Sequence, residues 1–457
     1  MAQKPSIPKG TRDFSPSEVA RRQYIIQTIR QGFEKFGFHP IETPSFENYE
    51  TLMGKYGEEG DRLIFKILNS GDYLAKADDA VLANKDSQKL TPHISEKALR
   101  YDLTVPFARY VVMHQNEIDF PFKRYQIQPV WRADRPQKGR YREFFQCDAD
   151  VVGSNSLWQE VEFILLYDSV FTALGIQGTT IKINNRKILS GIAEVIGAKD
   201  KLIDFTVALD KLDKIGEDGV KKEMIEKGIS EEAIQAVAPL FQLEGSFTEK
   251  LDQLAQMLAT STEGMKGIDE LRFVCEKALK AGLQSANLNL DVTLARGLNY
   301  YTGAIFEVAA PESVQLGSIG GGGRYDDLTG IFGLKNVSGV GISFGLDRIY
   351  LVMEELGLFP NAVNAASKVM FLNLGESEMD YAFNAVLKLR DLGIRTELYP
   401  DAAKMGKQFQ YADKKGIPYA VIVGSDEISQ QKYTLKHLGS GDQQIVSLDE
   451  MIQILEA

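Results

Sequence analysis

A run of about one hundred residues with a helical pattern, 187–284, interrupts this chain between two parts that have strand patterns. The run is rich in Glu and Lys and is broken at glycines. Strand-like segments lie before it, at 122–152, and after it, at 288–308. If strands from both flanks form one sheet, the helical run is an insertion into that fold. We therefore expect an α+β domain made of residues 1–186 and 288–357, with a helical insertion at 187–287.

The last ninety residues have a pattern of their own. Residues 358–367 include a proline and several small residues and predict a linker. Beyond the linker, strand-like and helix-like segments alternate, which is typical of a small α/β domain, 368–457. The expected strands are 369–372, 395–399 and 419–423, and the expected helices are 379–392, 404–415 and 448–455.

Length and composition limit the class of protein. A chain of 457 residues is long enough for about three domains. Its 44% hydrophobic and 25% charged residues are ordinary for a folded globular protein. The two cysteines, Cys147 and Cys275, exclude a disulfide scaffold, and we expect Cys147 to be a buried structural residue. No apolar run reaches the ~18–20 residues of a membrane helix, and the N-terminus lacks a signal-peptide core, so we expect a cytoplasmic protein with no membrane contact.

Local signals define several elements. Ser15, followed by Pro16 and Glu18, predicts a capped helix that ends near Gly37, and 40–44 is expected to be an edge strand.

Other segments predict hairpins. The strands 122–131 and 141–152 are joined by a glycine-containing loop and should form an antiparallel hairpin, followed by a helix at 157–174. We expect a second hairpin at 288–308. The polar, turn-rich segment 70–98 is expected to be an inserted hairpin or a mobile loop.

The charge distribution has one local exception. A formal net charge of −11 argues against a protein that coats nucleic acid. Between residues 132 and 142, however, five basic residues accompany a single acid, Asp134. Such a run is either a solvated face or a local anion site, and its composition leaves both open.

Two glycine-rich segments are prominent. The run Gly320–Gly323 is either a simple turn or a place where the backbone closely approaches a ligand, and Arg324 after it favours an anion or nucleotide site. The segment 339–345 does not fit a dinucleotide fingerprint, because its last glycine is one position late. We expect a strand there, leading into a helix that continues through Met353.

Several catalytic signatures are absent from the sequence. The four histidines have no zinc-ligand spacing, and there is no nucleophile elbow or phosphate loop. We therefore expect no metal held by His or Cys. Arginines from distant segments would instead suit a triphosphate if they converge, because a guanidinium binds phosphate in a planar fork and keeps its charge. These are Arg132, Arg142, Arg296 and Arg348.

The segments 130–146 (VWRADRPQKGRYREFFQ) and 339–348 (GVGISFGLDR) resemble motifs 2 and 3 of class II aminoacyl-tRNA synthetases, and 15–44 resembles motif 1. Three further segments match one branch of that class: 99–106 (LRYDLTVP), 294–303 (LARGLNYYTG) and 321–328 (GGGRYDDL). Over essentially its whole length, the chain therefore resembles the histidyl-tRNA synthetase family.

This resemblance implies a fold, a reaction and partners. The implied fold is a class II antiparallel sheet with flanking helices, a helical insertion that helps grip tRNA, and a C-terminal α/β anticodon-binding domain. The implied reaction joins L-histidine to ATP as histidyl-adenylate and then transfers the histidyl group to tRNA(His). Mg²⁺ is expected with the ATP, and 15–44 is expected to build a homodimer. The loop 135–140 is the expected reader of the tRNA acceptor end.

The resemblance also implies residue roles. Arg132 and Arg296 are the expected catalytic residues at the α-phosphate, and Arg348 is expected at the γ-phosphate. The implied ATP-binding residues are Arg132, Asp134, Arg140, Arg142 and Arg348. The implied histidine-binding residues are Asp102, Thr104 and Gln146 for the ammonium and Asp150, Tyr300 and Tyr301 for the ring. The implied glycine-rich pocket wall is Gly321, Gly322 and Gly323. Three positions depart from the family: Asn299 stands where Asp is frequent, Asp134 where Glu is common, and Asp150 in place of a longer Glu.

Three alternative functions were weighed against this one. A regulatory paralogue serving histidine biosynthesis would bind histidine without charging tRNA. It would lack the catalytic arginines or the anticodon domain, and this chain has both. A non-catalytic sensor of uncharged tRNA is opposed by the intact motifs. A synthetase for another amino acid is opposed by the two histidyl-type segments.

Overall fold

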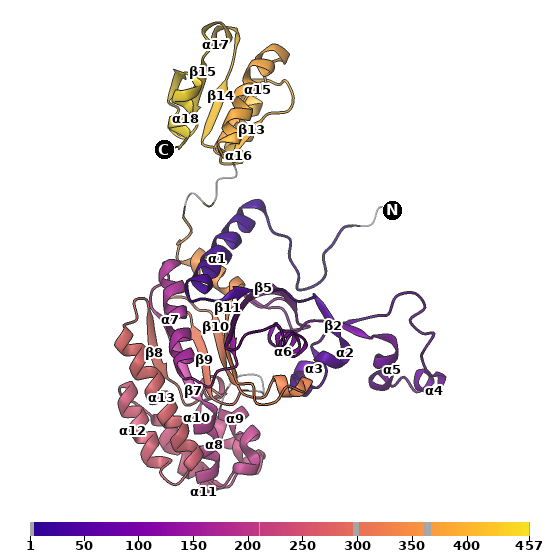
Figure 1. Cartoon of the computed structure of the whole chain (residues 1–457), viewed down its shortest axis with the longest axis vertical. Helices are drawn as coiled ribbons and strands as arrows, with labels where there is room; N and C mark the ends of the chain where they lie inside the picture. Colours follow the sequence, from indigo (N-terminus) through magenta and orange to yellow (C-terminus); the bar gives the residue numbers. More distant parts are fainter. Residues whose placement is uncertain (1–3, 210, 296–300, 361–362, 364–366, 457) are drawn as a thin grey trace. The chain divides into compact units, whose positions relative to one another are not determined.

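The computed structural model describes residues 4–209, 211–295, 301–360, 363 and 367–456. The chain divides into two compact units. The large unit comprises residues 1–12 and 25–358, and the C-terminal unit comprises 13–24 and 359–457 (Figure 1). The domain boundaries expected at residues 187 and 287 lie inside the large unit and stay predictions.

An eight-stranded sheet forms the centre of the large unit. Among the described residues, its six inner strands pair antiparallel and a short strand pairs parallel at each edge. The expected antiparallel sheet is therefore confirmed. In order across the sheet the strands are β1 (His39–Pro40), β5 (Phe122–Trp131), β6 (Glu143–Val152), β11 (Gly339–Gly345), β10 (Gly320–Tyr325), β9 (Ala304–Ala309), β7 (Thr179–Asn185) and β8 (Ala286–Leu290).

Two long helices cover one face of this sheet. They are α1 (Pro16–Lys35) and α7 (Trp158–Ala173). The ring of Phe344 in β11 lies 5.8 Å from that of Phe33 in α1 and 5.6 Å from that of Phe171 in α7. Because neighbouring strand residues point to opposite faces, Ser343 and Gly345 point away from these helices. The other face is therefore free to carry a site.

The predicted cap of α1 is present. The backbone N–H of Ser15 donates to Glu18 Oε2 over 2.7 Å, and the Glu18 N–H donates to Ser15 Oγ over 3.4 Å. This reciprocal pair satisfies two of the helix's unpaired donors. Gly37 follows the helix with a φ of +81°, which glycine adopts without strain.

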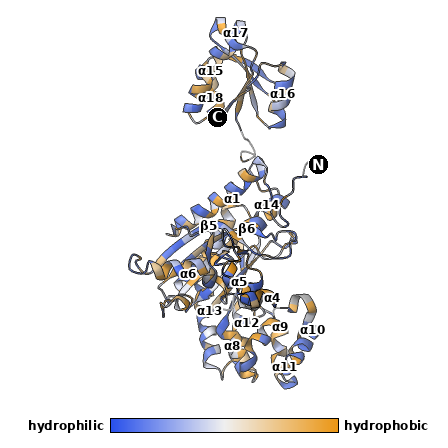
Figure 2. Cartoon of the chain, turned by 90° about the vertical axis from the view of Figure 1, so that its right-hand side faces the viewer, coloured by the Kyte–Doolittle hydropathy of each residue, from blue (hydrophilic) through white to orange (hydrophobic). Residues whose placement is uncertain are grey.

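The expected helical insertion is also present, and its helices carry interspersed hydrophilic and hydrophobic residues (Figure 2). It contains α8 (Arg186–Val195), α9 (Leu202–Leu209), α10 (Leu212–Glu226), α11 (Glu231–Val237), α12 (Phe247–Met257) and α13 (Thr262–Ala281). Further helices of the large unit include α2 (Tyr49–Leu52), α3 (Gly57–Arg62), α6 (Thr104–Met113) and α14 (Leu346–Glu355).

The segment 70–98 is not a hairpin, so that expectation was wrong. It forms two short helices, α4 (Asp79–Ala83) and α5 (Ser87–Ile94), and then enters β4 (Lys97–Leu99). The helices are capped by their preceding aspartates: Asp78 accepts from two backbone N–H groups over 2.9 and 3.0 Å, and Asp86 accepts from one over 3.1 Å. These polar residues, which looked like turn signals, are N-caps. Strand β4 lies between β2 (Phe46–Asn48) and β3 (Lys66–Ile67).

The prediction of a hairpin at 288–308 was also wrong. Both β8 and β9 exist, but neither pairs with the other, because β7 lies between them. Periodicity identifies strands but does not give their order in the sheet. Strand β7 comes before the helical insertion in the sequence, so its place between β8 and β9 could not be read from the pattern.

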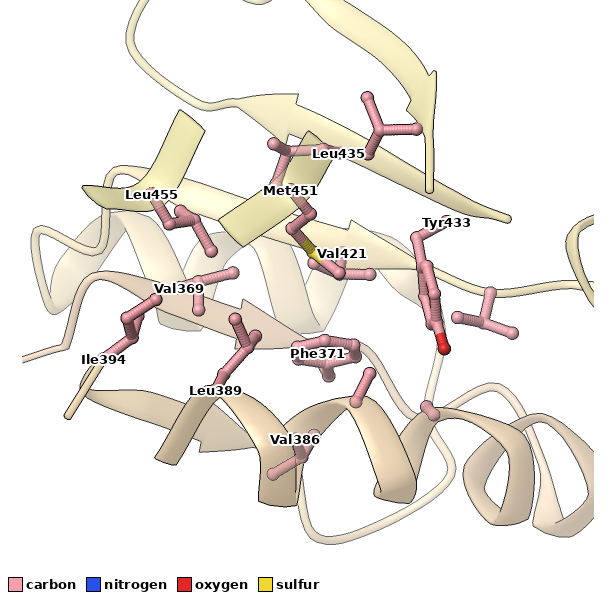
Figure 3. Close-up of a cluster of buried hydrophobic side chains, with 14 residues drawn as sticks. Val369, Phe371, Val386, Leu389, Ile394, Val421, Tyr433, Leu435, Met451 and Leu455 are labelled. Atoms are coloured by element: carbon pink, nitrogen blue, oxygen red, sulfur yellow. The ribbon is translucent and has the colours of Figure 1, made fainter. Parts of the chain in front are cut away.

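The C-terminal unit has a five-stranded mixed sheet. Its core includes Phe371 and Val421 from neighbouring strands and Leu389 from a helix (Figure 3). The strands lie in the order β13 (Thr396–Leu398), β12 (Val369–Phe371), β14 (Tyr419–Ile422), β15 (Tyr433–His437) and β16 (Gln443–Val446). The helices are α15 (Glu376–Asp391), α16 (Met405–Lys414), α17 (Ser425–Gln430) and α18 (Leu448–Glu456). The six predicted elements are confirmed, whereas β15, β16 and α17 were not predicted.

Candidate active site

A pocket of about 460 Å³ lies on the sheet of the large unit, a size suited to small-molecule substrates. Strands β6, β9, β10 and β11 contribute to its walls, together with the start of α6 and the connection between β5 and β6. The pocket thus brings together segments that are distant in the sequence. Of the predicted site residues, its lining includes Asp102, Thr104, Arg132, Asp134, Arg140, Gln146, Asp150, Tyr301, Gly321, Gly322 and Arg348.

The pocket is hollow because the central strands have small side chains. In register, Gly321 pairs with Ser343 and Gly323 pairs with Gly341. The run Gly320–Gly323 is therefore a strand in the middle of the sheet and not a turn. At Gly322 an added Cβ would lie 2.1 Å from the carbonyl oxygen of Gly341, so the two strands approach more closely than a side chain allows.

We expect Gly322→Ala to lower the free energy of unfolding by about 3 kcal/mol, because the methyl group overpacks a backbone contact that cannot move alone. Gly321→Ala is the matched control, since its Cβ would meet one carbonyl oxygen at 3.2 Å. Denaturant unfolding measures both variants. Equal losses in the two variants would contradict the close-approach explanation.

Arg324 does not bind an anion in this pocket, and that expectation was wrong. Its guanidinium is buried and pairs with both carboxylate oxygens of Glu160, over 2.5 and 2.7 Å. It also donates to Ser338 Oγ over 2.6 Å. Arg324 is absent from the described lining of the pocket. The residue after the glycine run therefore supports the fold instead of a ligand.

Two pocket arginines are positioned by backbone carbonyls. Arg132 Nε donates to the Tyr101 carbonyl over 3.0 Å, and its guanidinium lies 4.3 Å from the centre of the Tyr101 ring. Arg348 donates to the carbonyls of Gly139 and Ser318 over 3.2 and 2.5 Å. Backbone carbonyls thus fix the direction of both guanidinium groups.

A third pocket arginine is paired with an acid. Arg140 makes a two-point contact with Asp134, over 3.0 and 2.9 Å. The Asp134 backbone carbonyl accepts from Arg142 Nε over 3.1 Å. Arg142 and Gly323 are not among the described residues that line the pocket. Their predicted roles stay predictions.

Three buried aspartates give the pocket an acidic side. Burial raises the pKa of Asp102, although its Oδ1 accepts from Tyr56 Oη over 2.8 Å. Burial also raises the pKa of Asp148 to about 7 and raises that of Asp150. Arg124 opposes both of these shifts, and its Nη2 lies 2.7 Å from Asp150 Oδ2.

Several acceptor atoms in the pocket lack a donor. Asp102 Oδ2, Gln146 Oε1 and Asp148 Oδ1 are buried and have no hydrogen-bond partner within the described part of the chain. Buried acceptors are almost always hydrogen-bonded in folded proteins. All three residues line the same pocket. The pocket is therefore suited to a ligand with several N–H donors, such as an ammonium group or a nitrogen ring.

Sequence reasoning missed Asp148, Arg124, Tyr325 and Tyr56. Alternation along β6 places Asp148 on the same face as Gln146 and Asp150, and this signal could have identified it. Tyr56 and Arg124 lie outside the segments that carried the resemblance to synthetase motifs. Tyr325 lies inside one of these segments but was not assigned a role. Cys147 points away from this face and is a buried residue outside any disulfide, as expected.

Two predicted site residues, Arg296 and Tyr300, lie outside the described residues, as does Asn299. Their roles stay predictions. Tyr301, next along the chain, lines the pocket.

Within the described ranges, no three His, Cys, Asp or Glu side chains are grouped so that they could hold a metal ion. None of the helices that the structure describes is long and apolar enough to span a membrane.

Comparisons with known proteins agree with this architecture. The family model described as Histidyl-tRNA synthetase matches residues 83–349, and the model described as Anticodon binding domain matches residues 368–457. A histidine–tRNA ligase from Christiangramia forsetii is 73% identical over 97% of this chain and 97% of its own length. One from Flavobacterium johnsoniae is 70% identical over 98% of each chain.

A solved structure extends the similarity to three dimensions. The crystal structure of histidyl-tRNA synthetase from Nostoc sp. PCC 7120 has a TM-score of 0.83 and 33% sequence identity, covering 100% of this chain and 99% of that one. The sequence, the sheet and the pocket thus lead to one conclusion: the chain belongs to the histidyl-tRNA synthetase family of class II aminoacyl-tRNA synthetases.

Proposed function

We propose that this pocket binds L-histidine and ATP, joins them as histidyl-adenylate, and then passes the histidyl group to tRNA(His). As in its family, the protein is an ATP-dependent histidine–tRNA ligase. The observation that carries the proposal is the combination, in one pocket, of unpaired buried acceptors with arginines that are directed by backbone carbonyls. The first group suits an amino acid's ammonium and ring, and the second suits phosphates.

Histidine is held by the acidic side of the pocket. The free acceptors of Asp102 and Gln146 take the ammonium protons, and Thr104, which also lines the pocket, assists them. Asp150, Tyr301 and Tyr300 have the role of recognising the imidazole ring. An analogue that lacks the ring N–H would leave buried acceptors unpaired, which is a strong basis for rejecting it.

ATP is held by the arginines. Arg132 and Arg296 stabilise charge at the α-phosphate as the histidine carboxylate attacks it and pyrophosphate leaves. Arg348 holds the outer phosphates, while Asp134, Arg140 and Arg142 support the adenine end. The histidine carboxylate is itself the nucleophile, so catalysis consists of positioning and charge stabilisation.

Mg²⁺ accompanies ATP in this proposal. Mg²⁺ keeps several waters and binds through phosphate oxygens with one or two carboxylates, so it requires no dedicated protein cage. The described residues hold no cluster of three metal-ligating side chains, and Mg²⁺ bound in this way needs none. When bound, the ion would neutralise charge on the outer phosphates.

The proposed contacts with tRNA are local. The loop 135–140 contacts the acceptor end, and the C-terminal unit reads the anticodon. From residue 368 onward the chain has ten Lys and Arg and thirteen Asp and Glu residues. Anticodon recognition therefore depends on shaped contacts and hydrogen bonds more than on bulk positive charge.

A cytoplasmic homodimer is the expected form of the enzyme. Helix α1 has an apolar stripe that could suit a dimer interface, but its members Ile25, Ile29 and Phe33 are fully buried within their own chain. The stripe is therefore accounted for by the core, and the dimer proposal depends on family membership. Light scattering on the purified protein tests it, and a mass of one chain would contradict it.

Charging of tRNA tests the proposed function. Purified protein, ATP and labelled histidine should transfer label to tRNA(His) and to no other tRNA. The regulatory alternative predicts histidine binding without charging, and that outcome would contradict the proposal.

A further inference from the structure

The side chain of Asp148 has a distinctive position in the pocket. It lies in β6 between Gln146 and Asp150, and alternation places these three side chains on one face of the sheet. All three line the pocket, and Asp148 is only 2% exposed. Across the sheet it pairs in register with Ser343 of β11, whose side chain hydrogen-bonds the Asp148 carboxylate. Its neighbours Cys147 and Ala149 belong to the other face.

The contacts of the two β6 aspartates differ. Asp150 is held at both oxygens: Tyr325 Oη donates to Oδ1 over 2.6 Å, and Oδ2 forms an ion pair with Arg124, whose Nη2 lies 2.7 Å away. Neither Asp150 Oδ2 nor Asp148 Oδ1 accepts a hydrogen bond among the described residues. Asp148, which the family resemblance did not assign, is therefore the β6 aspartate whose unpaired oxygen has no ion-pair partner in the described part of the chain.

We propose that Asp148 is a further specificity-determining residue, whose buried Oδ1 accepts a ring N–H from the imidazole of the substrate histidine. The inference rests on the histidine-binding role proposed above for this pocket. Asp150, fixed by Arg124 and Tyr325, then serves as a rigid second wall of the ring site. A neutral imidazole has one N–H donor and one acceptor, so a carboxylate at one edge matches it directly.

The surroundings of Asp148 are consistent with such a ligand. Burial, together with Asp150 and Asp102, raises its pKa to about 7, while Arg124 on β5 and Ser343 on β11 oppose the shift. The charge of Asp148 in turn helps to raise the pKa of Tyr167 of α7. A donor supplied by the ligand would favour the ionised carboxylate, because a hydrogen bond to the charged form stabilises that form.

Asp148→Asn tests this inference because it keeps the size and removes the charge. Calorimetry should give a dissociation constant for histidine about 10- to 100-fold higher than in the unchanged protein. ATP binding should stay within about twofold, because no phosphate contact is lost. Thienylalanine, whose five-membered ring has no N–H, should bind both proteins equally, since it has no bond to lose.

Asp168→Asn is the matched control. Asp168 is a buried aspartate outside the pocket that accepts from the N–H groups of Gln284, Ser285 and Ala286 over 2.8–2.9 Å. Its loss should lower stability without changing histidine affinity. Two results would overturn the inference: unchanged histidine affinity in Asp148→Asn, or parallel weakening of histidine, thienylalanine and ATP. Binding is measured directly, so the result is independent of whether the protein charges tRNA.

Discussion

Replacing Arg132 by alanine is expected to lower the kcat of histidine-dependent ATP–pyrophosphate exchange by about 100- to 1,000-fold. The guanidinium lies in the pocket, directed by the Tyr101 carbonyl and stacked near the Tyr101 ring. It therefore needs no rearrangement when negative charge develops on the α-phosphate. Loss of one such preorganised donor acts mainly on the transition state, so kcat should fall more than the KM for histidine rises.

Two further variants make this expectation specific. Arg132→Lys should recover little activity, because an ammonium cannot reproduce the planar fork of the guanidinium. Arg272→Ala removes an arginine from α13 that pairs with Asp252 on α12, and exchange should not change. An Arg132→Ala enzyme within threefold of the unchanged protein would contradict the role assigned to Arg132.

The second large effect is expected for stability. Glu160→Gln should lower the free energy of unfolding by about 3–5 kcal/mol, because it leaves the buried charge of Arg324 uncompensated. The side chains of Arg324 and Glu160 are 5% and 0% exposed, and two short contacts between them join α7 to β10. The value is obtained by unfolding the full chain in urea and analysing the transition that belongs to the large unit.

An exposed ion pair provides the comparison for this result. Lys76 and Glu96 are 3.0 Å apart, but their side chains are 75% and 54% exposed. Lys76→Ala should therefore change the free energy of unfolding by less than about 1 kcal/mol. Similar losses in Glu160→Gln and Lys76→Ala would mean that burial of the Arg324 pair has no special consequence.

Strands that are neighbours in sequence could be paired without the structure. The hairpin of β5 and β6 was predictable because one glycine-containing loop, 132–142, joins two segments with partial alternation. The pairing of β9 with β7 was not, since the whole helical insertion separates them and periodicity carries no information on strand order. The same limit explains why no strand was predicted at Gly320–Gly323, because a glycine run without side chains has no periodicity to read.

The candidate site divides in a similar way. Residues carried by motifs, such as Arg132 and Gln146, were found by resemblance and do line the pocket. Arg124 was not found, because its importance comes from lying opposite Asp150 across two strands. The role of Arg324 was predicted wrongly because the sequence shows its charge but does not show which residue it pairs with. Its partner, Glu160, lies on a different element.

Histidine activation is tested most directly by amino-acid-dependent ATP–pyrophosphate exchange with the purified protein, run separately with each of the twenty amino acids. We expect exchange with histidine alone, and its loss in Arg296→Ala. A folded protein that binds histidine yet supports no exchange with any amino acid would contradict the proposed ligase activity and favour the regulatory alternative.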